Sequence, residues 1–93
     1  MEIRIETVEK CCVVAIAGRL DTNTAVELDG ALGNIAATEV VLDCTALEYV
    51  SSAGLRVILA AHKRLSHLVL RGVRAEVRSV LDMTGFSRIL NIE

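Results

Sequence analysis

Hydrophobic and charged residues alternate at the start of the chain, which is the pattern of a half-buried strand. Within residues 2–7, Ile3 and Ile5 face one way, and the glutamates and the arginine beside them face the other. An unbroken apolar run, Cys11–Ala17, follows, as expected of a strand that is covered more completely. Since residues 7–10 can turn the chain, we predict that the two strands form a hairpin.

Three later segments have apolar residues every three or four positions, the spacing of an amphipathic helix. The first begins near Thr24, which stands three residues before Glu27, as in a capping box. The second helix is predicted over residues 51–65 and the third over residues 75–84, with Gly85 as a candidate C-terminal cap. The apolar face of the first helix would be formed by Ala25, Leu28, Leu32 and Ile35.

Short apolar runs between these helices predict the remaining strands, at Val40–Leu42, Leu68–Leu70 and Ile89–Ile92. We expect a loop from Cys44 to Val50, with the Tyr49 side chain turned inward. The predicted element order is β-β-α-β-α-β-α-β, so the fold class is α/β. Alternation of helices and strands implies right-handed crossovers and a mixed β-sheet, with helices packed mainly on one face.

The composition supports one globular domain and argues against several classes of function. Hydrophobic residues make up 53% of the 93 residues, which supplies one aliphatic core. The net charge is −2 and no basic run is present, so the chain lacks the electrostatic footprint of a nucleic-acid-binding protein. No apolar stretch could span a membrane, and the charged start is unlike a signal peptide. We therefore expect a cytoplasmic protein.

The reactive side chains do not show the spacing of a catalytic or metal site. The three cysteines, Cys11, Cys12 and Cys44, include no Cys-x-x-Cys pair, and His62 and His67 have no ligand at metal-binding spacing. Neither the nucleophile elbow Gly-x-Ser-x-Gly nor a phosphate-binding loop occurs. We expect reduced, structural cysteines, no metal or cofactor, and no enzymatic activity.

The segment from Asp43 to Arg56 places two hydroxyl groups, those of Ser51 and Ser52, where the second helix is predicted to begin. The first turn of a helix has unpaired N–H groups and the positive end of the helix dipole. Either serine could simply cap the helix, which is the commoner role of serine in such a place. The same helix start would also accept a phosphate, which adds roughly −1.5 to −2 charges.

This segment resembles the signature of the STAS domain, the family of the anti-sigma factor antagonists. The resemblance lies in a strand, then Asp43, a loop, the aromatic-apolar pair at 49–50, and the run Ser-Ser-Ala-Gly-Leu. Residues 18–21 resemble the Gly-x-Leu-Asp segment that follows the second strand of that family. Further matches at 70–73, 76–78 and 81–86 extend the resemblance over nearly the whole chain, in the right order.

The resemblance implies a protein that binds an anti-sigma factor, which is also a GHKL-type serine kinase, and thereby frees a sigma factor. The kinase would inactivate the antagonist by phosphorylating a serine at the start of the second helix, and a PP2C-type phosphatase would restore it. Aligned through Gly54, this phosphoacceptor is Ser52, with Ser51 as a possible competitor. The residues assigned to the partner-binding surface are Asp21, Asn23, Ser51, Gly54, Leu55 and Arg56. Asp21 could also cap a helix, a role compatible with partner contact.

Two departures from the family pattern concern the extent of the domain. The joint between the second helix and the next strand, Ser66-His67, is very short, and the sequence stops at Glu93, where family members continue into a final helix. Either residues 1–93 form a minimal single STAS domain without that helix, or residues are missing. An uncovered surface there could favour a homodimer. STAS proteins also act as binding modules in lipid-trafficking and stressosome-type complexes, which is the alternative function.

Overall fold

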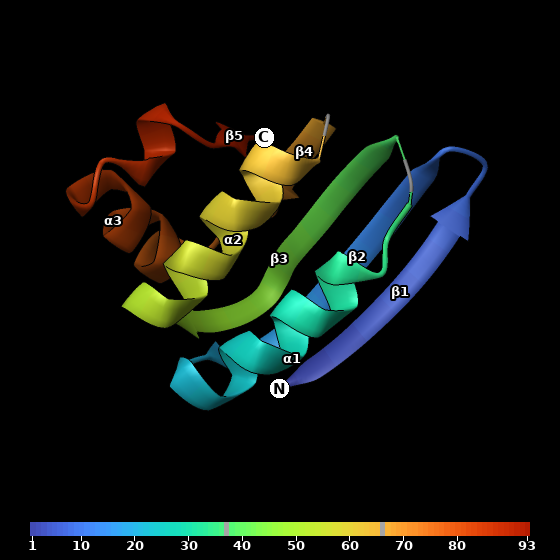
Figure 1. Ribbon diagram of the computed structural model, residues 1–93. Coiled ribbons are helices and arrows are strands. Elements are labelled where there is room, and N and C mark those ends of the chain that lie inside the picture. The colour runs from blue at the N-terminus through green and yellow to red at the C-terminus, as the bar shows by residue number, and fades with distance from the viewer. Residues whose placement is uncertain (37, 66) are drawn as a thin grey trace.

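The computed structural model describes residues 1–36, 38–65 and 67–93 (Figure 1). Ser66, part of the short joint noted in the sequence, lies outside the described residues. In chain order the elements are β1 (Glu2–Val8), β2 (Cys11–Leu20), α1 (Thr22–Gly33), β3 (Glu39–Val50), α2 (Ser52–Arg64), β4 (His67–Arg71), α3 (Ala75–Met83), the 3-10 helix η1 (Phe86–Arg88) and β5 (Asn91–Ile92).

The strands form one five-stranded sheet in the order β1-β2-β3-β4-β5. β1 runs antiparallel to β2, and the other neighbours are parallel, which confirms the predicted mixed sheet and element order. α1 and α2 lie side by side across one face of the sheet (Figure 1). The largest fully buried side chains of the core are Ile16, Leu20, Leu28, Leu32, Leu42, Leu47, Ile58, Leu68, Leu70, Leu81, Val14 and Val40.

The second half of β3 corrects the prediction of a loop with an inward Tyr49. Residues 44–50 continue the strand, but the pairing with β2 shifts twice, between Ala15 and Ala17 and between Gly18 and Arg19. Each shift inserts an extra residue into β3, as in a β-bulge, and a bulge redirects the side chains that follow it. Tyr49 is therefore exposed at 39%, on the opposite side of the strand from the core.

The start of α1 differs from the predicted capping box. The N-cap is Asp21, whose carboxylate accepts hydrogen bonds from the N–H groups of Asn23 and Thr24, both at 3.0 Å. The Thr24 hydroxyl in turn accepts from the Asp21 N–H at 2.8 Å, so Thr24 is the third helical residue of the box and not its cap. At the other end of the element, Ile35 packs on the core from outside the helix.

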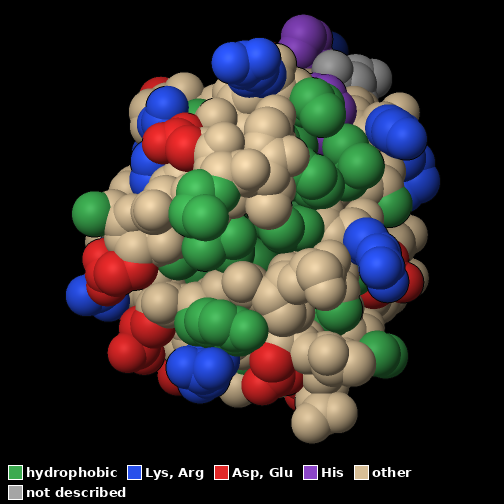
Figure 2. All heavy atoms as spheres, turned by 90° about the vertical axis from the view of Figure 1, so that its left-hand side faces the viewer, with side chains coloured by type: hydrophobic (Ala, Val, Ile, Leu, Met, Phe, Trp, Pro, Cys, Tyr) green, Lys and Arg blue, Asp and Glu red, His purple; other side chains and the backbone are tan. Residues whose placement is uncertain are grey.

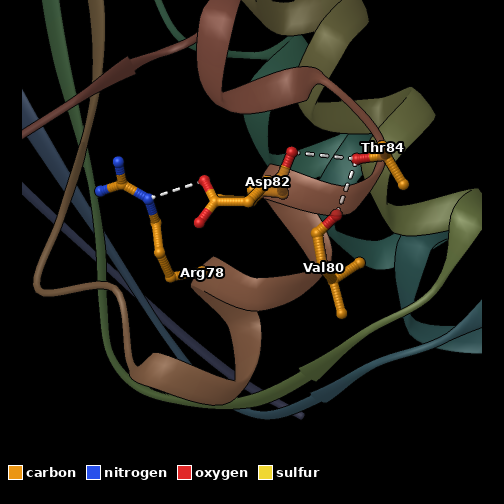
Figure 3. A network of polar contacts seen from close by, with 5 residues as sticks. Arg78, Val80, Asp82 and Thr84 are labelled. Carbon is orange, nitrogen blue, oxygen red and sulfur yellow. Dashed lines mark hydrogen bonds and ion pairs between the residues drawn. The ribbon is translucent and has the colours of Figure 1, made fainter.

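Polar contacts hold the end of α3 (Figure 3). Arg78 Nε and Asp82 Oδ1, four residues apart, lie 3.2 Å from each other as an exposed ion pair. The Thr84 hydroxyl donates to the carbonyl oxygen of Val80 at 2.8 Å, which also accepts from the Thr84 N–H, and to that of Leu81 at 3.2 Å. Gly85 follows with φ of 80°, the left-handed conformation that ends many helices, so its predicted capping role is confirmed.

The final strand is shorter than predicted, because it begins at Asn91 and not at Ile89. β5 contains only two residues, and Ile89 lies before it with half of its side chain exposed. Figure 2 views the side of the molecule that bears α3, where hydrophobic side chains gather among charged ones. No helix in the described part of the chain is long and apolar enough to cross a lipid bilayer.

Candidate functional site

The starts of α1 and α2 are adjacent, at the carboxyl ends of β2 and β3. In the parallel pairing of these strands, Leu20 lies opposite Val50, the last residue of each strand. One residue further on, the Ser51 N–H donates to the Leu20 carbonyl oxygen at 2.8 Å. The carboxyl ends of parallel strands, where helices begin, are the usual position of binding sites in α/β folds. The structure thus brings the predicted Asp21 and Ser51 regions together.

Ser51 is the N-cap of α2. Its backbone is extended, with φ of −93° and ψ of 173°, and its hydroxyl oxygen accepts a hydrogen bond from the Gly54 N–H at 3.2 Å. The side chain is half-buried. This geometry satisfies one of the unpaired N–H groups of the first helical turn. Of the two roles that the sequence allows for the serine pair, Ser51 fills the capping role.

Ser52 is the first residue of α2 and is exposed to solvent. It therefore lies where the unpaired N–H groups and the positive end of the helix dipole favour a negative charge. The first turn of α2 contains no acidic residue. A negative charge added at Ser52 would have no carboxylate beside it within that turn and would be stabilised by the helix.

Gly54 was assigned to the partner-binding surface, but it is buried, and a side chain is excluded at this position by packing. A Cβ atom built on Gly54 would lie 2.6 Å from Leu20 Cγ and 3.1 Å from Val50 Cγ2. These distances are too short for a side chain, so glycine lets the first turn of α2 rest directly on the ends of β2 and β3. Leu55 is also part of the core, with 4% of its side chain exposed. The structure therefore assigns Gly54 and Leu55 to the support of the site instead of its surface.

The polar residues assigned to the surface are accessible to different degrees. Asn23 and Arg56 are exposed, and Asp21 is half-buried. Backbone hydrogen bonding from Thr24 is the main cause of a lowered Asp21 pKa, with help from the Thr24 hydroxyl, the Asn23 N–H and the nearby charge of Arg19. Asp21 is thus a fixed negative charge at the start of α1.

A neighbouring pair, Arg19 and Tyr49, was not predicted to belong to this region. The two residues are paired in the strand register, and the Arg19 guanidinium carbon lies 4.1 Å from the centre of the Tyr49 ring. This is the geometry of a cation–π contact, and both residues are exposed. The direction of the Tyr49 side chain depends on the bulge in β3. Apolar and polar residues alternate too irregularly over 44–50 for the sequence to predict that direction. In the sequence, only the position of Arg19, directly before Leu20 and Asp21, indicated that it lies in this region.

Two other residues of the signature segment have structural roles. Asp43 Oδ1 accepts hydrogen bonds from the hydroxyl of Thr45 at 2.6 Å and from its N–H at 3.0 Å, and these bonds lower the Asp43 pKa. Arg71, opposite Asp43 in the register, lowers it further. Burial raises the pKa of Cys44 to about 12, so its thiol is protonated and inert at neutral pH.

Comparison with known proteins gives a consistent set of relatives. The sequence model of the STAS domain family matches residues 2–93. A protein of Bordetella bronchiseptica named as an anti-sigma factor antagonist, BtrV, is 30% identical over 99% of this chain and 85% of its own length.

Two solved structures share the fold. The crystal structure of an anti-sigma factor antagonist from Mycobacterium paratuberculosis has a TM-score of 0.89, at 23% identity over 98% of this chain and 83% of that one. The structure of the Bacillus cell fate determinant SpoIIAA in its phosphorylated form has a TM-score of 0.68, at 17% identity over 99% of this chain and 91% of that one.

Proposed function

The chain belongs to the STAS domain family, and from that premise we propose that it is an anti-sigma factor antagonist switched off by phosphorylation of Ser52. In its unphosphorylated form it binds an anti-sigma factor that is also a GHKL-type serine kinase, and so frees a sigma factor in the cytoplasm. A PP2C-type phosphatase reverses the modification. The protein acts by binding and not by catalysis.

The observation that supports this proposal most directly is that Ser51 caps α2 while Ser52 is exposed. The Ser51 hydroxyl oxygen is engaged by the Gly54 N–H, whereas Ser52 is exposed on the first turn of α2. Phosphorylation of Ser51 would disturb the hydrogen bond that caps the helix. Phosphorylation of Ser52 would leave that bond in place, so the fold can tolerate it. Ser52 is therefore the better acceptor of the two.

The phosphate would act on the partner and not on the fold. It would add roughly −1.5 to −2 charges to a surface that otherwise presents the neutral start of α2. Docking of a partner over this surface would have to desolvate the new charge, and any acidic group of the partner would be repelled. Asp21 and Asn23 at the start of α1, and Arg56 on α2, would supply the polar contacts that the phosphate disrupts.

Binding measurements with the anti-sigma factors of the host test the proposal. Ser52→Asp is expected to weaken binding to one of these kinases at least tenfold, and Ser52→Ala is expected to bind as wild type does. With ATP present, the kinase should add one phosphate to wild type, found on Ser52 by peptide mass spectrometry. Ser52→Ala should remain unmodified.

Ser79→Asp is the matched control, since Ser79 is also exposed but lies on α3. It places the same charge on the same domain and should leave binding unchanged. The proposal fails if Ser52→Asp binds every candidate kinase as tightly as wild type, or if the phosphate is found on Ser51.

A further inference from the structure

β1 is an outer edge of the sheet, and its free side is open (Figure 1). Six of its seven residues are exposed, including the apolar Ile5 at 50% and Val8 at 64%. A long edge strand with exposed apolar side chains is a template for pairing with another strand. Natural edge strands are usually protected by charges or bulges. Of these two kinds of protection, β1 has charged side chains but no bulge in its pairing with β2, so its backbone remains regular enough to pair with another strand.

The hairpin geometry tells which backbone groups of β1 point outward. Val8 and Cys11 are paired across the two-residue turn formed by Glu9 and Lys10, so the turn closes with a hydrogen-bonded pair. Hydrogen-bonded and non-hydrogen-bonded pairs alternate along an antiparallel ladder. Val8, Glu6, Arg4 and Glu2 are therefore hydrogen-bonded to β2. Ile3, Ile5 and Thr7 occupy the non-hydrogen-bonded positions, so their N–H and C=O groups point away from β2.

The charges on β1 select one register for a second strand of the same sequence. The charged side chains at residues 2, 4 and 6 lie on one face, and Ile5 lies on the helix-covered face. Antiparallel pairing about a two-fold axis at Ile5 places Arg4 of each copy directly opposite Glu6 of the other, and Ile5 opposite Ile5. An axis at Arg4 would instead oppose Arg4 to itself and Glu2 to Glu6. An axis at Ile3 would oppose Glu2 to Arg4, but it would leave residues 6–8 of each copy without partners in the β1 strand of the other. Opposite charges facing each other stabilise a strand pair, and like charges destabilise it.

We propose that β1 is a self-association edge, on which a second copy of this chain pairs antiparallel about Ile5. The outward backbone groups of residues 3, 5 and 7 would pair with those of residues 7, 5 and 3 of the second copy. Arg4 and Glu6 would form the closer, non-hydrogen-bonded pairs. The interface is isologous, so the sheet becomes continuous across both copies. Arg4 Nε now lies 3.5 Å from Glu2 Oε1 in an exposed ion pair, which is weak enough for Arg4 to pair with Glu6 of the second copy instead.

Charge-reversal variants of the full 93-residue chain test the register. Arg4→Glu makes both facing positions acidic, and Glu6→Arg makes both basic. Sedimentation equilibrium should show a concentration-dependent dimer for wild type, with the dissociation constant raised about tenfold or more in each variant. An equimolar mixture of the two variants should form a heterodimer at least as readily as wild type forms a homodimer, because every facing pair is then of opposite charge.

Arg78→Glu is the matched control, because it makes the same charge change in the exposed Arg78–Asp82 pair of α3. It should leave the dimer unchanged, and circular dichroism should show that all variants fold. The proposal is overturned if wild type remains a monomer up to millimolar concentration. It is equally overturned if the charge reversals leave the dimer intact, or if the mixed variants fail to associate. None of these outcomes depends on whether Ser52 is phosphorylated.

Discussion

α1 and α2 begin side by side at the same edge of the sheet, yet their first turns differ in charge. α1 is capped by the carboxylate of Asp21, and α2 is capped by the neutral hydroxyl of Ser51. Neither helix has an acidic residue within its first turn. At neutral pH the dipole of α1 is thus matched by a negative charge, while that of α2 is not.

This difference explains how one of two similar helix starts could serve as a switch. A helix start whose cap is already charged gains little from a further anion and repels it. The start of α2 has its hydrogen-bonding need met by Ser51 without any charge, so Ser52 remains free to acquire one.

The largest effect is expected from Gly54→Ala, which places a methyl group where Leu20 Cγ would be 2.6 Å away. The start of α2 would have to move off the sheet, and we expect a loss of about 1–3 kcal/mol in the free energy of unfolding. Urea denaturation measures this loss. Gly30→Ala, in α1, is the control, since its Cβ would meet nothing within 4 Å. That variant should gain up to about 1 kcal/mol. Equal behaviour of the two variants would contradict the packing role of Gly54.

Removal of the neutral cap comes next. Ser51→Ala deletes the acceptor for the Gly54 N–H and should cost about 1 kcal/mol, or about 4–8 °C in Tm. Ser51→Asp should retain the stability of wild type, because an aspartate caps a helix as well as a serine does and makes the start of α2 resemble that of α1. Calorimetry distinguishes the two variants. An unchanged Tm for Ser51→Ala would mean that the cap contributes nothing.

A smaller effect is expected from Asp21→Asn, which keeps a capping side chain but removes its charge. The Asp21 pKa lies below 3.8 in the folded protein, so the folded state favours the carboxylate. The stability that this charge contributes is present above pH 3.8 and is lost as the pH falls through the folded-state pKa. Wild type should therefore be the more stable protein at neutral pH, and the difference should vanish in strong acid. Urea titrations at both pH values provide the measurement, and a pH-independent difference would refute the role of the charge.

The smallest change in stability is expected from Ser52→Asp. The new carboxylate lies at the start of α2 and should add about 0.3–1 kcal/mol at low ionic strength, decreasing as salt screens the dipole. Thermal unfolding in low and high salt tests this. A clear loss of stability would show that Ser52 supports the fold, and the effect of Ser52→Asp on partner binding could then no longer be attributed to charge at the surface.

Local patterns in the sequence were sufficient for the fold class and for most of the elements, although not for the second half of β3. The alternation at Ile3 and Ile5, the apolar runs of the inner strands and the helical spacing of α1 to α3 each depend on neighbouring residues, and all were confirmed. The position of the serine pair at a helix start was predicted for the same reason. Burial of one face follows directly from such periodicity.

The tertiary structure alone decided which residues support the site and which form its surface. The sequence left open whether Ser51 or Ser52 is the cap, and it assigned Gly54 and Leu55 to the surface because both stand in the signature. Their burial depends on Leu20 and Val50, which approach only when β2 and β3 are paired. The outward direction of Tyr49 depends likewise on a shift in strand register. Contacts between distant segments are set by the packing of whole elements, and no local pattern encodes them.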